Sequence, residues 1–117
     1  MSFDENCLFC GIGRGEVPAD IVVDDDLVVA FRDISPKAPT HVLLIPRQHV
    51  ASAAELGEQH AEMLGRLFAV AAKVARDAGV AERGFRLVTN AGPGAGQSVN
   101  HLHFHLLGGR SLGWPPG

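Results

Sequence analysis

One long amphipathic segment, residues 58–78, most constrains the fold that this chain can adopt. Its apolar residues recur at steps of three and four, which predicts an α-helix with one buried face, and Gly79 is suited to end that helix. Strands are predicted on both sides of it, at residues 21–24, 27–32 and 41–46 before the helix and at 85–89 and 103–107 after it. Strands interrupted by a single long helix indicate an α+β fold rather than a doubly wound parallel sheet.

The bulk composition predicts a globular protein with a single domain, residues 1–117. A hydrophobic content of 46% and a charged content of 20% are ordinary for that class. The net charge of -3 provides no general attraction to nucleic acid or to an anionic membrane, and we expect neither partner. No apolar run approaches the roughly 20 residues that cross a bilayer, and the acidic first residues do not resemble a secretory signal. A cytoplasmic location is therefore expected.

Three of the six histidines, His101, His103 and His105, occupy every second position of a predicted strand. Side chains alternate faces along a strand, so this spacing brings three imidazoles to one side while Leu102 and Phe104 fill the other. Three interpretations are open at this point. The run is a polar sheet face without chemistry, an open zinc site that needs a further ligand and a bound water, or a nucleophilic site in which one imidazole attacks and its neighbours assist.

A glycine-rich connection, residues 90–98, precedes the histidine run. Gly92, Gly94 and Gly96 allow the backbone to approach a ligand closely, and exposed amides there can form a nest for an anion. The segment is not a phosphate-binding loop of the Walker type, because no Gly-Lys-Ser/Thr follows. A flexible hairpin connection is the alternative. Beside the histidines we favour phosphate binding, with uncharged donors supplied by Asn90, Gln97 and Ser98.

The run from His101 to Leu107 matches the signature of the histidine triad family, in which histidines alternate with apolar residues. The similarity continues in order from about Cys7 to the end of the chain. Segments that resemble the nucleoside phosphoramidase branch of that family are residues 31–36 (Phe-Arg-Asp-Ile-Ser-Pro), 38–41 (Ala-Pro-Thr-His), 44–46 (Leu-Ile-Pro), 96–98 (Gly-Gln-Ser), 108–110 (Gly-Gly-Arg) and 114–117 (Trp-Pro-Pro-Gly).

This resemblance implies a five-stranded antiparallel sheet with one long helix and a short N-terminal helix, the sheet continuing across a homodimer. It implies hydrolysis of the P–N bond of purine nucleoside 5′-phosphoramidates, such as adenosine 5′-phosphoramidate or AMP-lysine. The reaction would pass through a nucleotidyl-histidine, release nucleoside monophosphate and need no cofactor. Two alternatives are a dinucleoside polyphosphate hydrolase and a nucleotide-binding interaction protein with little turnover.

The resemblance also implies roles for individual residues. His103 would be the nucleophile, His41 would orient the triad, and Ser98 would contact the leaving amine. Asp33 would accept hydrogen bonds from the ribose. The phosphate would be held by His105, Asn90, Gln97 and the backbone at Gly96, Ser98 and Val99, and the base by an apolar slot of Leu8, Phe9, Ile12, Phe31 and Ile34.

Plainer roles compete with several of these. Asp33 could cap the loop before Pro36, Leu8, Phe9 and Ile12 could equally be core, and Asn90 and Gln97 could satisfy loop backbone. His60, on the predicted helix, receives no role and is expected to be solvated.

Cys7 and Cys10, the only cysteines, supply half of a tetrahedral zinc set. Free thiols and a reversible disulfide are the alternatives. The resemblance implies that His49 and His101 complete a structural zinc site. His101 would then be drawn away from the phosphate, and the sequence leaves open whether it serves the zinc or the triad.

Overall fold

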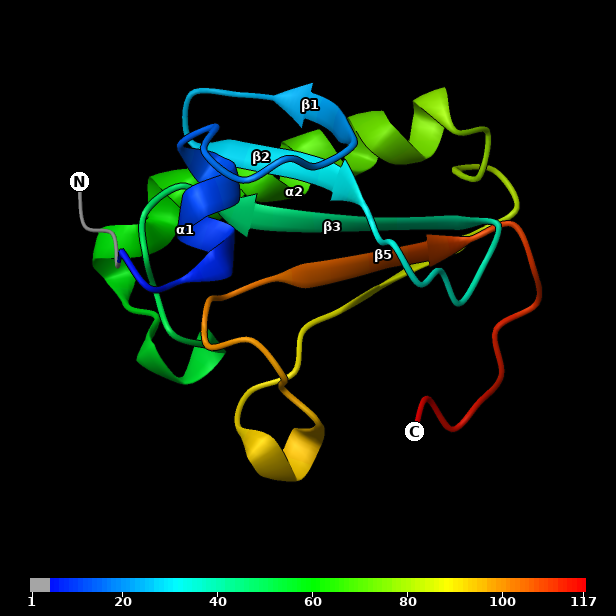
Figure 1. Ribbon diagram of the computed structural model, residues 1–117. Helices are drawn as coiled ribbons and strands as arrows, with labels where there is room; N and C mark the ends of the chain where they lie inside the picture. The colour runs from blue at the N-terminus through cyan, green and yellow to red at the C-terminus, as the bar shows by residue number, and fades with distance from the viewer. Residues whose placement is uncertain (1–4) are drawn as a thin grey trace.

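The computed structural model describes residues 5–117, and within them five strands form one antiparallel sheet in the order β1-β2-β3-β5-β4 (Figure 1). One face of the sheet carries the long helix α2, and the other carries the short helix α1. This arrangement confirms the predicted α+β fold, and every strand end lies within one residue of its predicted position. The bounds are α1 Leu8–Gly13, β1 Ile21–Asp24, β2 Val28–Arg32, β3 Thr40–Pro46, α2 Ala61–Asp77, β4 Phe85–Val88 and β5 Phe104–Gly108, with 3₁₀ turns at Ala53–Glu55, Glu58–His60 and Pro93–Ala95.

The start of α2 differs from the sequence prediction. Residues Glu58–His60 form a 3₁₀ turn, and the helix begins at Ala61. The backbone N–H of Gly57 donates to His60 Nδ1 at 3.0 Å, and His60 is buried with 7% of its surface exposed. The prediction of a solvated His60 was wrong, because its ring serves as the acceptor for an N–H that precedes the helix and has no partner within it.

The C-terminal end of α2 follows the predicted pattern. Gly79 adopts a φ of 76°, in the left-handed region that favours glycine. The N–H of Val80 then bonds to the carbonyl of Ala75 at 2.9 Å, which closes the last turn. Among the helices of residues 5–117, none has both the length and the apolar character needed to span a membrane.

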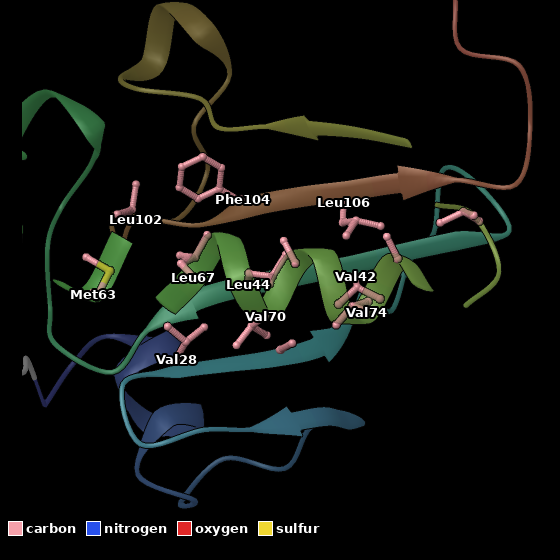
Figure 2. Packing of buried hydrophobic residues seen from close by; sticks show 14 of the residues in the cluster. Val28, Val42, Leu44, Met63, Leu67, Val70, Val74, Leu102, Phe104 and Leu106 are labelled. Carbon is pink, nitrogen blue, oxygen red and sulfur yellow. The ribbon is translucent and has the colours of Figure 1, made fainter. Parts of the chain in front are cut away.

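The larger hydrophobic cluster, here called the α2-side core, lies between α2 and the sheet (Figure 2). Leu67 of α2 is completely buried in it, as the three- and four-residue spacing of the helix predicts, and so is Leu44 of β3. The cluster is almost wholly aliphatic. Its buried members are Val28, Ala30, Val42, Leu44, Val50, Met63, Leu67, Val70, Ala71, Val74, Ala75, Val80, Leu102, Phe104 and Leu106.

A smaller hydrophobic cluster, the α1-side cluster, lies on the opposite face of the sheet. It takes the alternate residues of β2 and β3 and covers them with two residues of α1. Phe9 and Phe31 meet edge to face with ring centroids 5.6 Å apart. Its buried members are Phe9, Ile12, Val29, Phe31, Leu43 and Ile45.

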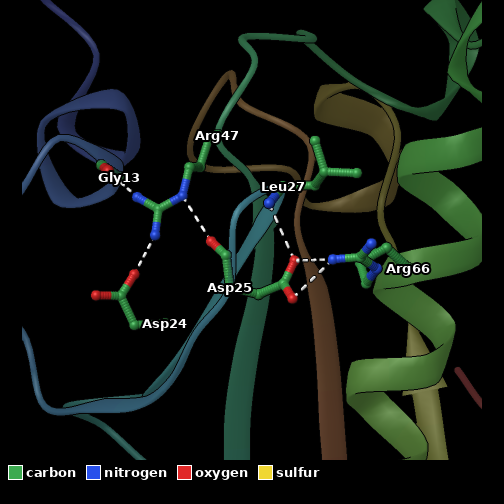
Figure 3. A network of polar contacts seen from close by, with 6 residues as sticks. All are labelled: Gly13, Asp24, Asp25, Leu27, Arg47 and Arg66. Atoms are coloured by element: carbon green, nitrogen blue, oxygen red, sulfur yellow. Dashed lines mark hydrogen bonds and ion pairs between the residues drawn. The ribbon is translucent and has the colours of Figure 1, made fainter.

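Arg47, directly after β3, ties three segments together (Figure 3). Its guanidinium donates to the carbonyl of Gly13 at the end of α1, to the Asp24 carboxylate, and to the carbonyl of Asp25 at 2.8 Å. The Asp25 carboxylate accepts from Arg66 of α2 at 2.9 and 3.1 Å. The turn between β1 and β2 is therefore anchored to both helices.

Candidate functional site

The histidine run divides its side chains between the two faces of the sheet. Leu102, Phe104 and Leu106 enter the α2-side core, and the three histidines lie on the α1 side. Only His105 belongs to β5 itself, where it is paired with Leu43 of β3 and Val88 of β4. His101 and His103 come just before the strand, so their backbone groups are available for contacts other than the ladder.

A chain of hydrogen bonds fixes the tautomers of His41 and His105. The N–H of Lys37 lies 3.0 Å from His41 Nδ1, and a backbone N–H can only donate, so Nδ1 carries a lone pair. In the neutral ring Nε2 then carries the proton, which it donates to His105 Nδ1 at 2.9 Å. It follows that His105 presents Nε2–H, a donor, on its other side.

Asp33 joins the same pair from the end of β2. One carboxylate oxygen, Oδ2, lies 3.4 Å from His41 Nε2, and the other, Oδ1, accepts from the N–H of Ser35 at 2.7 Å. The second contact is the loop cap that the sequence allowed as the plainer role. Asp33 therefore both shapes its loop and places a negative charge beside His41.

The tautomer of His103 is set by the carbonyl of His101. His103 Nδ1 lies 2.7 Å from that oxygen, which can only accept, so Nδ1 carries the proton and Nε2 keeps a lone pair. The His103 and His105 ring centroids are 5.1 Å apart. A nucleophilic nitrogen and an N–H donor are thus presented by neighbouring rings, an arrangement suited to attack on phosphorus with support of a phosphate oxygen.

Burial keeps the rings of His41 and His105 uncharged. The pKa of His105 is lowered to about 4, chiefly by loss of solvent contact; the nearby His103 and His41 act in the same direction, and Asp33 opposes them. Burial also lowers the pKa of His41, against the charge of Asp33. Both rings are therefore neutral near pH 7, as the hydrogen bonds from the Lys37 N–H to His41 and from His41 to His105 require.

The glycine-rich loop is braced by Gln97. Its Oε1 accepts from the N–H of Gly92 at 2.8 Å, and its Nε2 donates to the carbonyls of Ala51 and Val99 at 2.7 and 2.9 Å. These bonds favour the alternative in which Gln97 satisfies loop backbone. Gly96 has a φ of 87°, so the loop needs glycine there, while Ser98 is exposed and Asn90 is half-buried.

The residues predicted to form the base slot fall into two groups. Phe9, Ile12 and Phe31 are buried in the α1-side cluster, with Val99 packed against it. Leu8 and Ile34 have 52% and 99% of their surfaces exposed. Phe9 and Ile12 therefore also serve as core, which was the competing interpretation, whereas Leu8, for which the same role was considered, is exposed.

Cys7, Cys10, His49 and His101 converge on one point, and their sulfur and nitrogen atoms all lie within 4.8 Å of one another. Cys7 Sγ is 3.3 Å from His101 Nδ1, and Cys10 Sγ is 3.3 Å from His49 Nδ1 and 3.5 Å from His101 Nδ1. Tetrahedral zinc with ordinary bond lengths holds sulfur and nitrogen ligands about 3.6 Å apart. The donor set fits zinc in type, number and spacing.

The backbone also prepares His101 for this cluster. Its Nε2 lies 2.8 Å from the carbonyl of Pro46, so Nε2 carries the proton and Nδ1 turns a lone pair toward the two sulfurs. Burial and the neighbouring His49 and His103 lower the pKa of His101 to about 4, against the hydrogen bond to Pro46. The ring is therefore neutral near pH 7, the state that metal coordination needs.

Asp33, His41 and His105 form a second group whose donor atoms lie within 4.8 Å of one another. This group is less suited to a metal. The N–H of Lys37 occupies His41 Nδ1, so Nε2 holds the proton and has no lone pair to offer. We assign the group to hydrogen bonding within the triad.

Residues 14–112 match the HIT domain family. The chain belongs to this family. It is 51% identical over 109 residues to the purine nucleoside phosphoramidase of Escherichia coli K12, a match that covers 93% of this chain and 92% of that protein. It is 47% identical to the 14 kDa zinc-binding protein of Zea mays, covering 97% and 90%. A HIT family hydrolase from Legionella pneumophila superposes with a TM-score of 0.94 at 49% identity, covering 96% of this chain and 100% of that one.

Several contacts that shape the site were absent from the sequence analysis. The carbonyls of Pro46 and His101 and the N–H of Lys37 set the tautomers of three histidines, and Thr89 Oγ1 donates to the carbonyl of His103 at 2.8 Å. Backbone groups leave no mark in a residue pattern. Thr89 lies one residue after β4, and its hydroxyl gave no signal there.

Proposed function

We propose that this protein hydrolyses the P–N bond of purine nucleoside 5′-phosphoramidates, such as adenosine 5′-phosphoramidate or AMP-lysine. The observation that carries the proposal is the pair of fixed tautomers, with the lone pair of His103 Nε2 beside the Nε2–H of His105. The 51% identity to a purine nucleoside phosphoramidase supports the same substrate class.

The proposed reaction has two steps at His103. Its Nε2 attacks the α-phosphorus, the P–N bond of the substrate breaks, and the electron pair leaves with the amine, which takes up a proton. Ser98 contacts that amine. Water then attacks the nucleotidyl-imidazole, loses a proton and releases nucleoside monophosphate, while the electron pair returns to His103. Imidazole suits both steps because it is a good nucleophile when neutral and leaves readily from phosphorus.

The remaining residues hold the nucleotide. His105 Nε2–H, Asn90 and the backbone at Gly96, Ser98 and Val99 donate to the phosphate, and Gln97 supports that loop. Asp33 accepts from the ribose hydroxyls. The base lies against the α1-side cluster at Phe9, Ile12 and Phe31, and the exposed Leu8 and Ile34 complete the slot.

We also propose a structural zinc held by Cys7, Cys10, His49 and His101. The neutral His101 ring and the tetrahedral spacing support it, as does the likeness to a zinc-binding protein. When bound, the metal cross-links α1 to the segments that follow β3 and precede β5. It takes no part in the chemical steps, and the reduced thiols that it needs suit a cytoplasmic location.

A homodimer completes the proposal. β4 is an edge strand of the sheet, and all four of its residues are half-buried in a single chain. An edge of this kind can pair with a second copy and continue the sheet. The oligomeric state can be measured by sedimentation.

Release of AMP from adenosine 5′-phosphoramidate tests the proposed activity. We expect turnover by the wild type and a fall of more than about 1000-fold in His103→Ala, the scale seen when a covalent nucleophile is removed. His60→Asn, which alters a buried histidine away from the triad, is the matched control and should keep its activity. Equal turnover by wild type and His103→Ala would contradict the proposal.

Two further measurements separate the alternatives. Faster turnover of diadenosine polyphosphate than of phosphoramidate on the same preparation would favour the polyphosphate hydrolase. A nucleotidyl adduct on His103, trapped by rapid acid quench and located by mass spectrometry, would exclude a protein that only binds nucleotides.

A further inference from the structure

His101 contacts both sites through two different groups. Its ring belongs to the cluster of Cys7, Cys10, His49 and His101, with Nδ1 3.3 Å from Cys7 Sγ. The other ring nitrogen, Nε2, lies 2.8 Å from the carbonyl of Pro46. Its own carbonyl accepts from His103 Nδ1 at 2.7 Å. A rotation of the His101 backbone that releases the ring from the cluster therefore also moves the oxygen that holds His103.

Helix α1 makes a second connection between the cluster and His103. Cys7 caps this helix, since its sulfur accepts from the N–H of Cys10 at 3.3 Å, and both sulfurs belong to the cluster. Phe9 lies between Cys7 and Cys10 in the sequence. Its ring meets the His103 ring at 88° with centroids 5.2 Å apart. It also meets the ring of His101, at 6.1 Å. The position of the Phe9 ring depends on where the two cysteines hold α1.

We propose that the cluster of Cys7, Cys10, His49 and His101 positions the nucleophile His103, so that zinc occupancy sets the rate of the chemical step. The His101 carbonyl holds the Nδ1–H tautomer and the ring plane of His103, and the edge of Phe9 restricts its tilt. This inference rests on the proposed phosphoramidase function. The four cluster residues are positioning residues, since His103 alone touches the phosphorus.

The effect falls on kcat more than on KM because the ribose and the phosphate are held by other parts of the chain, and only the base lies against α1, at Phe9 and Ile12. Asp33 comes from the end of β2, His105 from β5, and the phosphate donors from residues 90–99. None of the four cluster side chains is among these groups. A His103 ring that samples other tilts or the other tautomer still permits binding, but it presents Nε2 to the phosphorus less often.

The first experiment compares zinc-free and zinc-reloaded wild type. We expect kcat for adenosine 5′-phosphoramidate to fall about 10- to 100-fold without zinc, the usual range for loss of a supporting contact, and KM to change by a smaller factor. Imidazole ¹⁵N shifts should report the Nδ1–H tautomer of His103 in the loaded protein and a mixture of tautomers in the zinc-free protein. The shifts are read without substrate, so they do not depend on activity.

Cys7→Ser tests the same coupling without a chelator. Serine is a preferred N-cap residue, so the start of α1 keeps its cap while the cluster loses a thiolate. Zinc content should fall, kcat should approach that of the zinc-free wild type, and added zinc should not restore it. His60→Asn should match the wild type in zinc content, kcat and the His103 shifts.

The coupling would be overturned by zinc-free wild type with an unchanged kcat and unchanged His103 shifts, or by a folded Cys7→Ser that loses zinc and keeps full kcat. A protein that takes up no zinc would overturn it as well. Failure of the phosphoramidase proposal looks different, because His103→Ala would then equal the wild type whatever the zinc content. If Cys7→Ser does not fold, the comparison of zinc-free with reloaded wild type decides alone.

Discussion

The two faces of the sheet are stabilised in different ways. On the α2 side, fifteen buried residues from helix and strands form a core that is almost wholly aliphatic. On the α1 side, six buried apolar residues adjoin three histidines whose rings are held by backbone carbonyls and ring nitrogens. Dispersion and burial tolerate small shifts of side chains, whereas a hydrogen bond fixes direction. The α2 face therefore supplies stability, and the α1 face supplies orientation.

The largest effect on stability should come from the α2 face. Leu67→Ala leaves a cavity at a position with no exposed surface, and we expect a loss of about 2–5 kcal/mol in the free energy of unfolding. Urea denaturation measures it. Activity per folded molecule should be unchanged, because α2 and the triad histidines lie on opposite faces of the sheet. A large fall in kcat of the folded fraction would contradict the division between the faces.

Acid should weaken the α1 face selectively. The pKa of His105 is about 4 in the folded chain and 6.5 as an ordinary histidine, so below pH 6.5 the unfolded chain binds a proton that the folded chain does not. Stability should therefore be present above pH 6.5 and be lost as the pH falls toward 4. Thermal midpoints at pH 7 and pH 4.5 measure the loss.

His105→Gln provides the control for this pH dependence, since it removes the titrating ring. Its midpoint should fall less between the two pH values, with a residual loss from the other buried histidines. The cost of Leu67→Ala should be the same at both pH values because Leu67 packs in the aliphatic cluster, on the face of the sheet opposite His105. Equal acid sensitivity of His105→Gln and wild type would count against the lowered pKa.

The smallest expected effect concerns a single hydrogen bond. Thr89→Val keeps the shape of the side chain and removes the hydroxyl that donates to the His103 carbonyl at 2.8 Å. We expect a stability loss of about 0.5–1.5 kcal/mol and a decrease of a few-fold in kcat. Thr89→Ser, which retains the hydroxyl, should recover most of the activity. No difference between the valine and serine variants would show that this bond does not position His103.

The sequence predicted the fold well because the pattern of buried positions is periodic. The three- and four-residue spacing in α2 and the alternation at His101, His103 and His105 both report which side chains face a core. The start of α2 was missed because it depends on His60 accepting from the N–H of Gly57. A histidine at that position looks the same whether it is solvated or buried.

The candidate site was predictable in its residues and not in their protonation. The side chains that converge, His41 with His105 and the cysteines with His49 and His101, were all named from the sequence. Which nitrogen of each ring carries the proton depends on the N–H of Lys37 and on the carbonyls of Pro46 and His101. Every residue has these backbone groups, so only the three-dimensional arrangement distinguishes them.

Residues 46–49, which begin with the last residue of β3, have a consequence for how this chain can change in length. Pro46 holds the His101 ring, Arg47 anchors the end of α1 and the turn after β1, and His49 reaches Cys10. Connections between strands usually accept insertions and deletions freely. Here a single inserted residue would displace the contacts of Pro46, Arg47 and His49 at the same time. We expect natural and engineered length variation to avoid residues 46–49 and to be accepted more readily at the exposed turn around Glu82.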